Sequence, residues 1–167
     1  DAAEQAILEP WRGHLPESAF GPAWVPPRND GSGMIRPRLR EAYQLLLDAG
    51  WRIESDRMVN ADGEHLRFEF LLVQADFERV LLSYKRNLAA LGIDMNLRRV
   101  DISQYINRLR SRDFDMVVSS FVQSNSPGNE QREYWHSSSA DNPGSRNLMG
   151  LKDPAIDALV EGLIESD

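Results

Sequence analysis

The chain has 167 residues, a length that suits one domain with one buried core. Its formal net charge of −7 argues against a nucleic-acid partner, because binding to phosphates requires clustered lysine and arginine side chains. No apolar run approaches the roughly 20 residues that a membrane-spanning helix needs, so we expect no membrane span. Cysteine is absent, which excludes disulfides and thiolate metal sites.

The first 35 residues are rich in proline. Proline fixes φ and removes a backbone donor, so this segment is predicted to be irregular after a short helix within residues 1–13. Phe20, Trp24 and Val25 are too apolar for a free linker. We therefore expect residues 1–35 to form an ordered arm with a glycine hinge at 31–33, followed by one domain over 36–167.

From residue 36 onward, helix and strand patterns alternate. Apolar stripes that end at Gly50 and Gly92 predict helices, and Asp76 and Asp101 are predicted N-caps of the second and third helices. The expected elements are helices over 37–49, 77–91 and 102–109, one from residue 154, and strands over 58–59, 66–73, 93–98 and 114–121. This order predicts the α/β class, with a mainly parallel sheet and flanking helices.

A polar run over residues 123–135 directly follows the strand predicted at 114–121. Open α/β sheets usually bind ligands at the carboxyl ends of their strands, and amide side chains both donate and accept hydrogen bonds. The alternative interpretation is an exposed surface loop in which Trp135 only packs. The candidate ligand-binding residues are Gln123, Asn125, Asn129, Glu130, Arg132 and Trp135, with Arg146 and Asn147 from a second polar turn.

Catalytic and metal-ligating patterns are weak. None of the three histidines has a second histidine at i+3 or i+4, the spacing that would build a metal-binding face on a helix, so we expect no metal and no cofactor. Three serines follow His136 without the sequence of a nucleophile elbow, and we expect a polar turn there. Asp113 and Asp115 share one face at the amino end of a strand, where solvated or capping carboxylates are expected.

Two competing hypotheses remain at this point. One is a small flavodoxin-like hydrolase or transferase that uses Asp113, Asp115 or His136, or the serine pair at 119–120. The other is a structural interaction domain, which would present an apolar face and no cleft. The amide-rich run favours a binding protein that is not an enzyme.

Three motifs in this order carry a family resemblance: LLLDAGW at 45–51, NLAALGI at 87–93 and DFD at 113–115. With them the chain resembles the C-terminal lobe of the family 5 extracellular solute-binding proteins of ABC transporters, over essentially all of its length. The segments SPGNEQREYW at 126–135 and GSRNL at 144–148 are most similar to the YejA-type branch, which is associated with oligopeptides and microcin C.

The resemblance implies one lobe of a type II periplasmic-binding-protein fold, with residues 1–35 arriving from the other lobe. It also implies a fragment of a longer, monomeric protein in the periplasm or outside the cell. That protein would bind a peptide or peptide-like compound between two lobes and deliver it to the permease subunits of its transporter.

One position departs from the family pattern. Many peptide-binding members follow the strand with an aromatic residue and then an aspartate that pairs with the peptide ammonium, whereas this chain has Val122 and Asn125 there. Asparagine supplies no charge. Three alternatives remain open: Glu130 replaces the aspartate, the ligand presents no free amine there, or the other lobe supplies the carboxylate.

Overall fold

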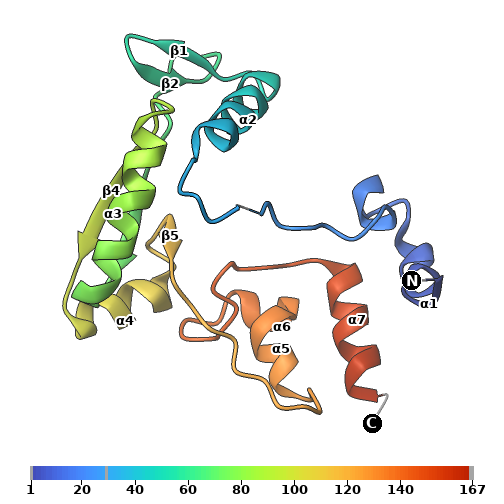
Figure 1. Ribbon diagram of the computed structural model, residues 1–167. Coiled ribbons are helices and arrows are strands. Elements are labelled where there is room, and N and C mark those ends of the chain that lie inside the picture. The colour runs from blue at the N-terminus through green and yellow to red at the C-terminus, as the bar shows by residue number, and fades with distance from the viewer. Residues whose placement is uncertain (1, 29, 166–167) are drawn as a thin grey trace. The chain divides into compact units, whose positions relative to one another are not determined.

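The computed structural model describes residues 2–28 and 30–165 (Figure 1). The chain forms two compact units. Unit 1 combines Asp1–Arg28 with Phe121–Asp167, and unit 2 is the continuous stretch Asn29–Ser120. The boundaries expected from the sequence, an arm over 1–35 and a lobe over 36–167, stay a prediction.

Unit 2 contains a three-stranded parallel sheet with the strand order β4-β3-β5. Its strands are β3 (Arg67–Leu72), β4 (Asp94–Arg99) and β5 (Met116–Val117). The register pairs Phe70 with both Leu97 and Met116, so β3 is the central strand. This arrangement confirms the predicted mainly parallel sheet. The strand expected over 114–121 is much shorter, because only two of its residues pair with β3.

Two helices connect these strands, α3 (Ala75–Ala89) and α4 (Ile102–Ser111). The predicted cap at Asp101 is confirmed, since its carboxylate accepts a hydrogen bond from the Gln104 backbone N–H at 2.9 Å. The predicted cap at Asp76 is wrong. Helix α3 begins at Ala75, so the capping position falls on Gln74 and Asp76 lies in the first turn.

Helix α2 (Arg36–Asp48) and a small antiparallel hairpin precede the parallel sheet. The hairpin strands are β1 (Arg52–Glu54), which the sequence pattern did not predict, and β2 (Arg57–Val59). Gly92 fixes the hairpin against the turn between α3 and β4, because its carbonyl accepts a hydrogen bond from the Met58 backbone N–H at 2.8 Å. Gly92 has a φ of +74°, as expected for a glycine that ends a helix.

The core of unit 2 lies between α3, β2, β3 and β4. Met58 and Met95 are fully buried, and side chains from α2, among them Leu39 and Leu46, pack against the same cluster. The buried cluster consists of Met58, Phe70, Leu72, Leu81, Leu88, Leu91, Ile93 and Met95.

Unit 1 is helical. It contains α1 (Ala2–Leu8), α5 (Glu130–Trp135), α6 (Ser137–Ala140) and α7 (Pro154–Glu165), with short 3-10 turns at Glu9–Trp11 and Glu17–Phe20 (Figure 1). His14 Nε2 lies 3.2 Å from Asp153 Oδ2, which links the N-terminal segment to the start of α7. Phe20 is buried, whereas Trp24 is 80% exposed and Val25 is 66% exposed.

Two segments expected to be loops contain helices. The run over 123–135 becomes α5 from residue 130 onward, and the three serines after His136 form α6 and not a polar turn. The His136 side chain caps α6, because Nδ1 accepts a hydrogen bond from the Ser138 backbone N–H at 3.0 Å. Among the described residues, no helix is both long and apolar enough to cross a membrane.

Candidate ligand-binding site

The predicted residues Gln123 and Trp135 meet at a second amide, Gln131. The buried Gln131 Oε1 accepts hydrogen bonds from Trp135 Nε1 at 3.1 Å and from Gln123 Nε2 at 3.5 Å. The ring of Phe121 lies 4.7 Å from that of Trp135 between centroids. Gln131 was not among the candidates, although its i,i+4 spacing to Trp135 is the signal that places both on one face of α5.

Glu130 is the first residue of α5, and its carboxylate has fixed hydrogen-bond donors. Its Oε1 accepts hydrogen bonds from the Gly128 backbone N–H at 3.0 Å and from Gln131 Nε2 at 3.4 Å. These donors, the Gly128 N–H first among them, hold the pKa of Glu130 below its ordinary value. A full negative charge therefore stands beside the amide and aromatic cluster at neutral pH. Asn125 and Val122 are exposed in the segment that leads to it.

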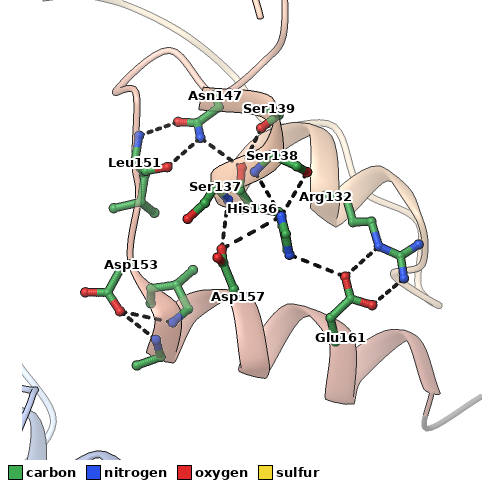
Figure 2. A network of polar contacts seen from close by, with 12 residues as sticks. Arg132, His136, Ser137, Ser138, Ser139, Asn147, Leu151, Asp153, Asp157 and Glu161 are labelled. Carbon is green, nitrogen blue, oxygen red and sulfur yellow. Dashed lines mark hydrogen bonds and ion pairs between the residues drawn. The ribbon is translucent and has the colours of Figure 1, made fainter. Parts of the chain in front are cut away.

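Arg132 contacts both Asn129 and α7. The Arg132 guanidinium donates to both carboxylate oxygens of Glu161, at 2.7 Å from Nε to Oε1 (Figure 2). Its Nη1 donates to Asn129 Oδ1 at 2.6 Å. The hydrogen bonds from Arg132 lower the pKa of Glu161. In this structure Arg132 joins α5 to α7, and the predicted contact of Arg132 and Asn129 with a ligand stays a prediction.

His136 lies between the carboxylates of Asp157 and Glu161. Its Nε2 is 3.5 Å from Glu161 Oε1, while Asp157 accepts a hydrogen bond from the Ser137 backbone N–H at 2.8 Å (Figure 2). The Ser138 hydroxyl lies 2.9 Å from His136 Nδ1. Nδ1 has one lone pair, and the backbone N–H of the same serine points at it. The geometry is therefore that of a helix cap, and it does not present Nδ1 as a base for the hydroxyl.

Arg146 and Asn147 support the backbone around the cluster. Arg146 Nη1 donates to the Tyr134 hydroxyl at 2.5 Å, and that hydroxyl donates to the Val122 carbonyl at 2.9 Å. Asn147 is fully buried, with its amide paired to both backbone polar groups of Leu151 (Figure 2). The buried amide makes a structural contact in unit 1, and its direct ligand contact is untested.

Asp113 and Asp115 hold the amino end of the parallel sheet. Asp115 Oδ2 accepts a hydrogen bond from the Glu69 backbone N–H at 2.7 Å, and Asp113 pairs with Arg108 at 2.9 Å. Arg108 also pairs with Glu69 at 2.7 Å. Each carboxylate thus has its own hydrogen-bond donor. This arrangement does not bring the two carboxylates together to share a proton.

A hollow opens at the other end of the sheet, within unit 2. It has a volume of about 290 Å³. Its lining includes Ser119 and Ser120 but, among the described residues that form it, no histidine or carboxylate that would activate a serine. Within 2–28 and 30–165, no three histidine, aspartate or glutamate side chains are grouped to hold a metal ion.

Known proteins resemble this chain in sequence and in fold. Residues 12–143 match the profile of the bacterial extracellular solute-binding proteins, family 5 middle. The probable peptide-binding protein YejA of Agrobacterium fabrum is 42% identical over 162 residues, which cover 96% of this chain and 26% of that protein. The peptidoglycan-binding protein YepA of the same organism is 36% identical over 166 residues, 99% of this chain and 27% of its own length. The chain thus spans about a quarter of these curated relatives.

A solved structure shows the same fold. The oligopeptide-binding protein AppA from Bacillus subtilis, in complex with a nonapeptide, superposes with a TM-score of 0.63 at 21% identity, over 95% of this chain and 32% of AppA. The α/β class and the type II periplasmic-binding-protein likeness are confirmed, as is the resemblance to the YejA-like branch. The family profile covers most of the chain, and this protein belongs to the bacterial extracellular solute-binding proteins of family 5.

Proposed function

We propose that this chain is part of the solute-binding component of an ABC importer. The whole protein would bind oligopeptides or peptide-like compounds between two lobes and deliver them to the permease subunits. The observation that carries this proposal is the family match over residues 12–143, joined to 42% identity with a probable peptide-binding protein.

The cluster around Gln131 supports a peptide-like ligand. Amides next to aromatic rings offer donors, acceptors and apolar surface together, which is the usual composition of a small-ligand site. Glu130 adds one negative charge beside them. We propose that its carboxylate pairs with the ammonium of the ligand, the role that Asn125 cannot fill because it carries no charge.

The proposal extends to location and assembly. Because the chain spans about a quarter of its curated relatives, we propose that the second lobe lies in the rest of a longer protein. That protein would act as a monomer in the periplasm or outside the cell. A binding role without catalysis fits the names of the relatives, which describe binding proteins.

The test is isothermal titration of the full-length protein with peptides of two to ten residues. Glu130→Gln is expected to weaken binding of peptides with a free amino terminus roughly tenfold or more, because a charge-assisted contact is lost. For N-acetylated peptides, Glu130→Gln should not weaken binding further, because these peptides have no ammonium group. Glu133→Gln, an exposed glutamate on the same helix, is the matched control. Absence of binding across all of these peptides would overturn the proposal.

A second candidate ligand is a peptidoglycan fragment. The similarity to YepA, which is named a peptidoglycan-binding protein, favours it, and amide side chains also suit sugar hydroxyls. The same titration with muropeptides separates the two ligands. Tighter binding of a muropeptide than of its peptide stem alone would assign the sugar a place in the site.

A further inference from the structure

The hollow in unit 2 forms where two paired strands separate. The ladder between β3 and β5 ends at the pair Leu71 and Val117. Beyond it, the Leu72 carbonyl accepts a hydrogen bond from Val100, on the β4 side. Residues 118–120 continue without strand pairing, and the Tyr105 hydroxyl of α4 donates to the Val118 carbonyl at 3.2 Å. The space therefore lies at the carboxyl ends of the strands, where open α/β sheets bind their ligands.

The wall of this hollow is uncharged. None of its nine lining residues carries a charge at neutral pH. Burial raises the pKa of Tyr105, which agrees with a poorly hydrated wall. Leu72 is 4% exposed and Val118 is 49% exposed, so the hollow has a buried floor and an open rim. The lining residues are Leu71, Leu72, Val73, Gln74, Phe77, Tyr105, Val118, Ser119 and Ser120.

The volume limits what can enter. At about 290 Å³ the hollow lies just below the roughly 300–1,000 Å³ typical of sites for a whole small ligand. It suits one large side chain better than an entire oligopeptide. A charged side chain would lose its hydration there without meeting an opposite charge, whereas an apolar one gains from leaving water.

We propose that this hollow binds one large apolar side chain of the peptide-like solute and so gives the protein a preference for that residue. The inference rests on the proposed function and adds a specificity-determining site to it. Phe77 and Val118 are two of the apolar residues that line the hollow, and Val118 at the rim is the position that a substitution can alter without disturbing the buried floor.

The experiment titrates the full-length protein with pentaalanine peptides in which each position in turn is leucine or lysine. At one position leucine is expected to bind roughly tenfold more tightly than lysine, from the burial of its side chain. Val118→Trp fills the hollow and should reduce this preference to about twofold or less. Val118→Asp keeps the space but adds a negative charge, and it should make the lysine peptide the tighter one at that position.

Val80→Trp is the matched control, because Val80 is 62% exposed on α3 and does not line the hollow. It should keep the leucine preference of the natural protein. If the natural protein binds no peptide at all, the proposed function fails. If peptides bind but both Val118 variants keep the leucine preference that the natural protein has at that position, the proposed function stands and the inference is wrong. Should Val118→Trp not fold, Val118→Asp decides alone.

Discussion

A buried amide at residue 147 ties the long turn after α6 to the start of α7. Asn147 is fully buried, and its side chain pairs with the Leu151 N–H at 2.8 Å and the Leu151 carbonyl at 3.0 Å. Asn147→Ala should lower the free energy of unfolding by about 1–3 kcal/mol, because both backbone groups lose their partners. Urea denaturation measures this, with the exposed Asn142→Ala as control. Equal stability of the two variants would contradict a structural role for the buried amide.

Single residues show where sequence reasoning stops. The polar run at 123–135 was predicted because amides and aromatic residues follow a strand, and the structure brings Gln123 and Trp135 together. The partner of Arg132 was not predictable, because Glu161 lies 29 residues further along the chain. A pair at that distance depends on how α7 packs against α5, which no local pattern records.

At the level of the elements, one glycine fixes a hairpin to a helix end. Gly50 and Gly92 both follow a helix with positive φ, at +87° and +74°. A Cβ on Gly50 would meet nothing within 4 Å, whereas one on Gly92 would lie 2.8 Å from the Met58 backbone nitrogen. Gly50→Ala should therefore cost only the left-handed backbone penalty, about 1–2 kcal/mol. Gly92→Ala should cost more, because the hairpin must move away.

The measurement is the unfolding free energy of both alanine variants in urea, with hydrogen exchange at the Met58 amide as a local probe. Faster exchange there in Gly92→Ala, and not in Gly50→Ala, is the expected result. Equal losses of stability in the two variants would mean that the close approach at Gly92 has no energetic weight beyond its φ.

Regular elements were the part of the fold that the sequence predicted well. Helices α3 and α4 and strands β3 and β4 have clear periodicity, and each was expected within a few residues. Strand β5 was overestimated, because an apolar run shows β propensity but does not show where its partner ends. Strand β1 was missed, since all three of its residues are exposed and offer no burial pattern.

Across unit 1, the carboxylates that join its helices make its stability depend on pH. Hydrogen bonds from Arg132 hold the pKa of Glu161 below its ordinary value of 4.5, and the Gly128 N–H does the same for Glu130. A carboxyl group with a lower pKa in the folded state stabilises that state above the unfolded pKa. The stabilisation is lost as the pH falls through the folded value.

We therefore expect the contact between α5 and α7 to weaken as the pH falls below about 4.5. Thermal unfolding between pH 7 and pH 3 tests this, with Glu161→Gln as the variant. The variant should have a lower Tm than the natural protein at pH 7, and the difference should narrow as the pH falls below 4.5. Glu133→Gln, exposed on α5, should keep the natural profile. A difference in Tm that stays the same down to pH 3 would show that Glu161 acts through packing and not through its charge. Protonation of its carboxylate would then leave the stability unchanged.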